Sequence, residues 1–249
     1  MKTIINPKYS ALGQYIAQIP QLMEHEGDTL HAGRNLIKVL RAPDGTLLNV
    51  KRYHRPSFFN ALVYSTALRK PKGKRAFEYP ARLLAAGVDT PEAVAYIEER
   101  RWGVLRHSWL VTIQCPYRHR LYELAEAPAG TYEPLADALA AMTARMHEAG
   151  MLHRDYSPGN ILWDVADGNT VFSVVDINRM RFGKVTLHDG CANFARLWGP
   201  KKFFERLARA YAQCRNLPEE ECVRTTMECR RRFWTRYARH HRISFKLEL

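Results

Sequence analysis

The chain has 249 residues, of which 38 are lysine or arginine and 25 are aspartate or glutamate, giving a formal net charge of +13. This excess of positive charge predicts a polyanionic partner. Hydrophobic residues make up 46% of the chain and charged residues 25%, which is ordinary for a folded protein and excludes a largely disordered or fibrous one. The length allows one large domain or two small lobes.

The cysteine content and the first residues indicate the compartment. Five cysteines form no Cys-x-x-Cys pair, which argues against a disulfide framework and for a reducing cytosol. A zinc site built from Cys214, Cys222, Cys229 and a nearby histidine is an alternative, but the spacing matches no closed zinc pattern. The first residues lack the apolar run of a secretory signal, and no apolar stretch approaches the roughly 20 residues of a membrane span. We therefore expect a soluble or peripheral protein.

In chain order, the first half of the sequence predicts mainly strands. Extended segments are predicted over residues 35–41, 46–53, 93–99 and 109–114. Helices are predicted over residues 57–68 and 74–86. The second helix should be kinked at Pro80 and end at a left-handed Gly87. Cys115-Pro116 ends the last extended segment, because proline cannot continue a central ladder.

The second half of the sequence predicts mainly helices. A helix is expected over residues 134–148, and everything after about residue 189 reads as helical. Short strands are expected over residues 161–163 and 170–176. The pattern predicts an α+β protein with a β-rich lobe over residues 1–115 and a mainly helical lobe over residues 116–249.

The segment from His153 to Asn160 (HRDYSPGN) is the most informative part of the sequence. An aspartate followed five residues later by an asparagine is typical of phosphoryl transfer by a kinase-type site. Asp155 would accept or orient the proton of the acceptor hydroxyl, and the amide oxygen of Asn160 would bind a metal ion. The alternative is a polar turn in which Asp155 caps the next element.

A second carboxylate follows the apolar run over residues 171–175, at Asp176. A carboxylate at the end of a buried strand is unfavourable unless it is paired or binds a cation. Mg²⁺ prefers oxygen ligands and takes one or two carboxylates together with substrate phosphates. Asp176 and Asn160 therefore predict an Mg²⁺ site, and the alternative is an aspartate that opens a turn.

Upstream residues complete the predicted nucleotide site in the expected order. Lys51 lies in an extended segment, where a rigidly held lysine can contact ATP phosphates. Glu78 lies on a following helix and could hold Lys51 by an ion pair. The alternatives are an exposed strand lysine for Lys51 and an i,i+4 pair with Arg82 for Glu78.

Together these residues resemble a known family, the bacterial lipopolysaccharide core kinases that phosphorylate Kdo or heptose. Similar segments are VKRY (residues 50–53), RAFE (75–78), LLAAGVDTPEAVAY (83–96) and DINRMRFG (176–183). The resemblance covers about residues 30–200 and implies a bilobal protein-kinase-like fold that uses ATP and Mg²⁺. It also implies the anionic glycolipid lipid A–Kdo as acceptor, at the cytoplasmic face of the inner membrane of a Gram-negative bacterium.

The resemblance assigns a role to each matching residue. Asp155 would be the catalytic base, and Asn160 with Asp176 would hold Mg²⁺. Lys51 would contact ATP phosphates, and Glu78 would position Lys51. By their order in the chain, Gln114 and Cys115 fall where the hinge that contacts adenine should lie.

Several departures from protein kinases narrow the prediction. No Gly-x-Gly-x-x-Gly loop precedes the first predicted strand, Ile177-Asn178 follows Asp176 in place of Phe-Gly, and no Ala-Pro-Glu is present. These differences favour a constitutively assembled small-substrate or glycolipid kinase over a regulated protein kinase. A protein or small-molecule kinase and a non-catalytic RNA-binding or scaffold pseudokinase are alternatives, although every charged catalytic position is filled.

The C-terminal segment carries much of the positive charge. Between Arg224 and Lys246 there are eight lysines or arginines and one acidic residue, with interleaved aromatic residues. The segment predicts a solvated basic helix, a nucleic-acid contact or an anionic membrane contact. The kinase motifs favour the membrane over nucleic acid, and the cluster from Arg230 to Arg232 is the predicted contact.

Overall fold

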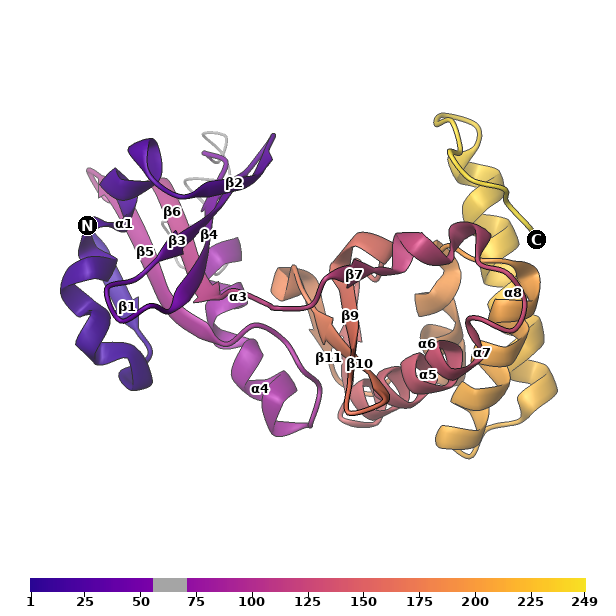
Figure 1. Cartoon of the computed structure of the whole chain (residues 1–249). Helices are drawn as coiled ribbons and strands as arrows, with labels where there is room; N and C mark the ends of the chain where they lie inside the picture. Colours follow the sequence, from indigo (N-terminus) through magenta and orange to yellow (C-terminus); the bar gives the residue numbers. More distant parts are fainter. Residues whose placement is uncertain (56–70) are drawn as a thin grey trace. The chain divides into compact units, whose positions relative to one another are not determined.

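The computed structural model describes residues 1–55 and 71–249 (Figure 1). This part of the chain has mixed α/β structure and divides into two compact units. The first unit contains the chain up to residue 82 together with residues 91–116, and the second contains residues 83–90 and 117–249. The helix predicted over residues 57–68 lies outside the described residues.

The first unit is built around an antiparallel sheet with the strand order β1-β5-β6-β4-β3-β2. Its strands are β1 (Lys2–Ile5), β2 (Asp28–Ala32), β3 (Leu36–Arg41), β4 (Leu47–Tyr53), β5 (Ala93–Arg101) and β6 (Val104–Ile113). The four strands predicted in this half correspond to β3, β4, β5 and β6. The sequence analysis did not predict β1 or β2.

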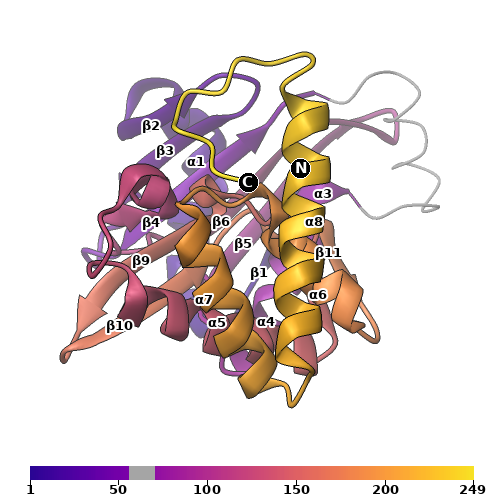
Figure 2. The same ribbon diagram turned by 90° about the vertical axis from the view of Figure 1, so that its right-hand side faces the viewer.

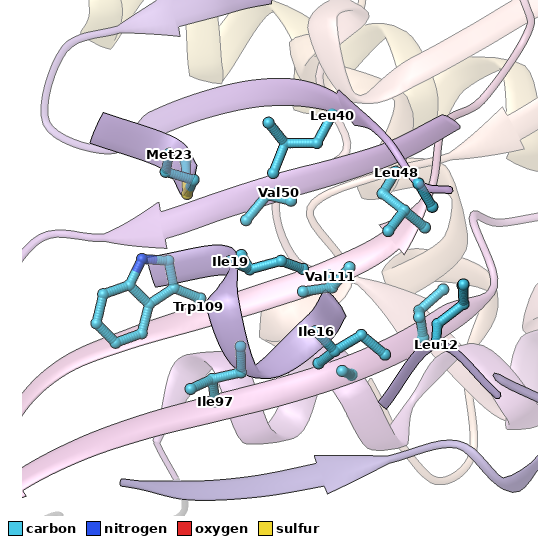
Figure 3. Packing of buried hydrophobic residues seen from close by; sticks show 13 residues of the cluster. Leu12, Ile16, Ile19, Met23, Leu40, Leu48, Val50, Ile97, Trp109 and Val111 are labelled. Carbon is cyan, nitrogen blue, oxygen red and sulfur yellow. The ribbon is translucent and has the colours of Figure 1, made fainter. Parts of the chain in front are cut away.

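One face of this sheet is covered by α1 (Gly13–His25), as Figure 3 shows. Ile16, Ile19 and Met23 recur at helical spacing and are buried against Val50 and Val111 of the sheet. Strand residues two apart share a face, so the residues of β4 that alternate with Val50 point to the other side. The core of the first unit therefore lies between α1 and the sheet.

The opposite face of the sheet carries α3 (Lys72–Glu78), which is followed by α4 (Pro80–Ala85). Tyr53 of β4 forms a small cluster there with Ala76 of α3. Gly73 allows the close approach, because a Cβ at this position would lie 2.5 Å from a ring carbon of Tyr96. The predicted kink at Pro80 and the left-handed Gly87, with φ of +67°, are confirmed.

The second unit combines two small sheets with a group of helices (Figure 2). Its strands are β7 (His119–Arg120), β8 (Met151–His153), β9 (Ile161–Ala166), β10 (Asn169–Val174) and β11 (Met180–Phe182). Its main helices are α5 (Glu133–Glu148), α6 (Leu187–Asn193), α7 (Lys201–Cys214) and α8 (Glu219–Tyr237). Strands β10, β9 and β7 form one sheet, and β11 pairs with β8 in the other. Helix α7 packs against α5 on one side and α8 on the other.

The end of the chain is not helical, although everything after about residue 189 was predicted to be. Helix α8 ends at Tyr237, and the following residues turn back toward the start of α7 (Figure 2). The Phe245 ring stacks on Trp198 with centroids 4.4 Å apart, and Glu248 accepts a hydrogen bond from the Lys201 N–H at 3.0 Å. Aromatic packing thus replaces helix in the last residues.

Helix α8 is amphipathic, which corrects the predicted basic cluster. Arg230 is 0% exposed, its guanidinium carbon lies 3.3 Å from the ring centroid of Phe204, and it donates to the Leu197 carbonyl at 2.7 Å. Arg231 and Arg232 are exposed. Arg230 therefore belongs to the interior and is not available to a membrane. No helix among the described residues is long and apolar enough to cross a bilayer.

Replacement of the core residue Ile19 should destabilise the protein. We expect Ile19→Ala to lower the free energy of unfolding by about 2–4 kcal/mol, because it leaves a cavity between α1 and the sheet. The matched control is Gln18→Ala on the exposed side of the same helix, which should change stability by no more than about 0.5 kcal/mol. Urea denaturation measures both variants, and equal midpoints would contradict the packing of α1.

Candidate active site

The loop between β8 and β9 is held by the side chain of His153, which is fully buried. Its Nδ1 accepts the N–H of Asp155 at 3.1 Å, so its Nε2 carries the proton and donates to the Val175 carbonyl at 3.0 Å. Burial lowers the pKa of His153, which keeps the ring in this neutral form. One imidazole therefore connects the backbone of Asp155 to the residue before Asp176.

Asn160 closes the same loop from its other end. It is the last residue of the short helix η3 (Pro158–Asn160), and its Nδ2 donates to the Asp155 carbonyl at 2.9 Å. Its own carbonyl accepts the N–H of Val175 at 2.9 Å. Asp155, Asn160 and the segment leading to Asp176 thus form one hydrogen-bonded unit.

Asp176 has an unusual backbone conformation. It precedes the short helix η4 (Ile177–Arg179) and has φ of 55° and ψ of 41°, in the left-handed region that few residues other than glycine adopt. Asn178 donates from its Nδ2 to Oδ1 of Asp176. Such conformations concentrate at functional sites, where the surrounding structure maintains them.

The donor set of this loop suits Mg²⁺. The amide nitrogen of Asn160 is already bonded, which leaves its Oδ1 as the atom for a metal ion, and Asp176 adds a carboxylate. Magnesium is bound by few protein oxygens, with water and phosphate completing its coordination. The alternative zinc site gains no support, because in residues 1–55 and 71–249 no group of three histidines, cysteines or carboxylates is placed to hold a metal ion.

A second set of hydrogen bonds supports β8 from the helices. Asn193 of α6 donates to the His153 carbonyl at 2.9 Å, so its Oδ1 accepts from His147 Nε2 at 3.1 Å. The other ring nitrogen of His147 accepts the hydroxyl of Tyr211 at 2.7 Å, and Arg215 donates to that hydroxyl oxygen at 2.5 Å. Helices α5, α6 and α7 are thereby connected to β8 and the loop that follows it.

The predicted phosphate-contacting residues lie in the first unit. Lys51 is in the middle of β4, and its ammonium nitrogen lies 5.4 Å from the ring centroid of Tyr53. Tyr53 packs with α3, and Lys51 is two residues away on the same strand, so it faces the same side of the sheet. Glu78 is the last residue of α3. The ion pair between Lys51 and Glu78 stays a prediction.

Gln114 and Cys115 directly follow β6. The N–H of Gln114 donates to the Leu47 carbonyl at 2.9 Å, and its side-chain amide donates to the Cys115 carbonyl at 3.0 Å. Asn49 donates to the Gln114 side-chain oxygen at 2.8 Å. Because its N–H is already bonded, an adenine contact from the Gln114 backbone would use its carbonyl oxygen.

Comparisons with known proteins assign the chain to a family. The model of the lipopolysaccharide kinase (Kdo/WaaP) family matches residues 32–213, which is more than half of the chain. This chain belongs to the lipopolysaccharide kinase (Kdo/WaaP) family. The resemblance predicted from the motifs is thereby confirmed, and kinase family membership supports a phosphotransferase that uses ATP, usually with Mg²⁺.

A solved structure described as WaaP in complex with acyl carrier protein is similar to this one. The TM-score is 0.63 at 19% sequence identity, and the match covers 97% of this chain and 100% of that one. At this identity the likeness shows a shared fold. The comparison with curated proteins found no match.

Two arginines of this lipopolysaccharide kinase family member contact Asp155 and were not predicted as site residues. Arg196, in the short helix η5 (Phe194–Arg196), donates from Nη1 to Oδ1 of Asp155. Nη1 of Arg179 lies 3.9 Å from Oδ2 of the same carboxylate. Arg179 lies inside the family-like DINRMRFG segment, so the sequence could have indicated it as a site residue. No motif marks Arg196.

The buried His147 should make stability depend on pH. Burial lowers its pKa from 6.5 to about 4. In the unfolded chain the pKa is about 6.5, so between these values the unfolded state binds more protons, and the free energy of unfolding falls as pH decreases from about 6.5 to about 4. The His147 contribution to this fall is roughly 3 kcal/mol at most. Urea denaturation across this range should show that the free energy of unfolding depends less on pH in His147→Gln than in the wild type.

The matched control for this measurement is His240→Gln, which changes an exposed histidine. This variant should keep the pH dependence of the wild type. If His147→Gln kept it as well, protonation of His147 would not be the cause.

Proposed function

We propose that this protein transfers the γ-phosphate of ATP to a sugar hydroxyl of the lipopolysaccharide inner core, with Kdo as the preferred acceptor and heptose as the alternative. The observation that carries the proposal is the hydrogen-bonded unit of Asp155, Asn160 and the segment before Asp176. In this proposal Asp155 would be the base, and Asn160 with the adjoining Asp176 would be the metal ligands.

In the proposed reaction, the acceptor hydroxyl oxygen forms a bond to the γ-phosphorus of ATP. The bond between that phosphorus and the bridging oxygen breaks, and ADP leaves with the bonding electron pair. The hydroxyl proton goes to the carboxylate of Asp155, whose backbone is fixed by His153 and Asn160. Mg²⁺ bound by Asn160 and Asp176 would neutralise charge on the phosphates.

The first unit would serve as the nucleotide-binding lobe and the second as the catalytic lobe of a bilobal kinase. In this assignment Lys51 contacts ATP phosphates, Glu78 positions Lys51, and Gln114 with Cys115 contacts adenine. Support comes from the side of the sheet that Lys51 shares with α3 and from the fold similarity to WaaP. The catalytic contribution is then mainly positioning and charge neutralisation.

The acceptor would be reached at a membrane. The outward side of α8 carries Arg224, Arg231, Arg232 and Arg236, which are all exposed. Each arginine or lysine near an anionic membrane surface contributes about 1 kcal/mol of binding. We therefore assign the protein to the cytoplasmic face of the inner membrane as a peripheral enzyme, with the lipid A–Kdo glycolipid as its anionic acceptor.

Replacement of the proposed base should strongly slow transfer without unfolding the protein. Asp155→Asn keeps the shape of the side chain but cannot accept a proton, so we expect the rate of phosphorylation to fall by about 10²–10⁴-fold. The assay incubates ATP and Mg²⁺ with Kdo-bearing and heptose-bearing lipid A acceptors, with and without acyl carrier protein, and detects products by mass.

The control is Asp167→Asn in the exposed turn between β9 and β10, which should keep full activity. Thermal stabilisation by Mg-ATP should be similar in both variants. Product formation by Asp155→Asn at the wild-type rate would contradict the role of this carboxylate.

Neutralising the exposed arginines of α8 should weaken membrane binding. The triple variant Arg231→Gln, Arg232→Gln and Arg236→Gln should bind anionic liposomes about 100-fold less tightly, because roughly 1 kcal/mol is lost for each residue. Sedimentation with phosphatidylglycerol vesicles measures this binding.

A variant with the same loss of charge elsewhere serves as the comparison. Lys2→Gln, Arg41→Gln and Arg101→Gln change three exposed cations of the first unit and should leave most of the binding intact. Equal losses in both triple variants would mean that total charge, and not α8, determines binding.

A further inference from the structure

Two guanidinium groups from different segments meet at the carboxylate of Asp155. Arg196 is hydrogen bonded to Oδ1, and Arg179 lies 3.9 Å from Oδ2. The side chains of Arg196 and Arg179 are 42% and 56% exposed, and that of Asp155 is 22% exposed. The three groups therefore lie at an open surface that a dissolved molecule can reach.

The arginines are not needed to hold the catalytic loop. The backbone of Asp155 is already fixed by the buried His153 and by Asn160. Exposed ion pairs contribute at most about 1 kcal/mol to stability. A contribution of this size does not explain why two cations gather on one carboxylate.

Around Asp155 the two guanidinium groups outnumber the carboxylate, which favours the binding of an anion. Within the described residues, Asp155 is the only carboxylate within 4.0 Å of either guanidinium group. Two positive groups thus share one negative group, and positive charge remains beside the proposed base. An acceptor hydroxyl that approaches Asp155 must displace or share these contacts, and an anionic group on the same acceptor would provide new partners for the arginines.

Both arginines extend from well-anchored backbone. Arg179 lies between Asp176 and Met180, and Met180 pairs with His153 in the β8–β11 sheet. Arg196 precedes Leu197, whose carbonyl is bound by the buried Arg230. The guanidinium carbon of Arg196 also lies 5.8 Å from the ring centroid of Phe233 on α8. An arginine with an anchored backbone and an exposed guanidinium group is suited to binding a ligand at a defined distance from Asp155.

We propose that Arg179 and Arg196 bind an anionic oxyacid group of the acceptor, next to the hydroxyl that receives the phosphate. A planar guanidinium matches two oxygens of a carboxylate or a phosphate, so either group fits. Kdo carries a carboxylate itself, whereas heptose offers such a group only through a neighbouring phosphate. The inference rests on the proposed function and names the feature by which the site selects its acceptor.

The test compares charged and neutralised acceptors. Arg179→Gln and Arg196→Gln should each raise the KM for a Kdo-bearing acceptor by about tenfold or more, the usual effect of losing one charge-assisted contact. The same variants should change the KM by less than about twofold when the Kdo carboxylate is converted to an amide. The KM for ATP should stay constant. The same KM comparison can be made for phosphate, with a phosphorylated heptose acceptor as the charged form and its dephosphorylated form as the neutral one.

The matched control is Arg181→Gln. Arg181 follows Arg179 by two residues and is similarly exposed, but it pairs with Asp189 at 2.7 Å and not with Asp155. This variant should leave the acceptor KM unchanged. A raised KM for ATP, or a loss of kcat equal for charged and neutralised acceptors, would overturn the proposal, because the arginines would then act on the transferred phosphate. An unchanged acceptor KM in both variants would overturn it as well.

A binding measurement separates this inference from the proposed function. Saturation-transfer NMR with free Kdo and its amide, and 31P line broadening with inorganic phosphate, detect ligand binding without turnover. If the wild type transfers no phosphate to any acceptor but binds an anionic probe through Arg179 and Arg196, the proposed function fails and the anion site stands. If the wild type phosphorylates the acceptors and the arginine variants bind the anionic probes normally, only the anion site fails.

Discussion

The loop that carries the proposed base depends on one buried imidazole. His153 accepts the Asp155 N–H and donates to the Val175 carbonyl, so a single neutral ring sets the distance between the proposed base and the residue before Asp176. A protonated ring could not accept the first of these bonds. Burial lowers the pKa of His153 and so protects the form that the loop requires. The burial of this histidine therefore helps to set the geometry of the proposed active site.

The rest of the second unit supports that arrangement at two levels. Asn193 and His147 transmit the packing of the helices to β8 through side-chain hydrogen bonds. On the other side, the left-handed backbone of Asp176 costs about 1–3 kcal/mol, and the β8–β11 pairing with the Asn178 contact offsets this cost. The helices thus stabilise a loop whose own conformation is unfavourable.

The sequence could predict site residues that are close together in the chain, but not contacts between residues that are far apart in it. Asp155 and Asn160 are close in the chain, so a short loop with the right spacing must bring them together. Arg196 lies 41 residues from Asp155, and only the packing of η5 brings the two into contact. Helix α1 escaped prediction although its buried residues are regularly spaced; it contains Pro20, which normally argues against a helix interior. The run of arginines on α8 gave no indication of which one would face inward.

The arginines of α8 lie in two different environments, one in the protein interior and the other at its surface. Arg230 points inward, where burial lowers its pKa to about 9, and it fixes the carbonyl next to Arg196. Phe233 of the same helix lies against the Arg196 guanidinium, while Arg231 and Arg232 point outward. One side of α8 therefore supports the proposed acceptor contact, and the other presents the surface proposed to meet the membrane. In this proposal α8 has two roles. Its exposed arginines bind the membrane that carries the acceptor, and its inward residues hold Arg196, which binds the acceptor itself.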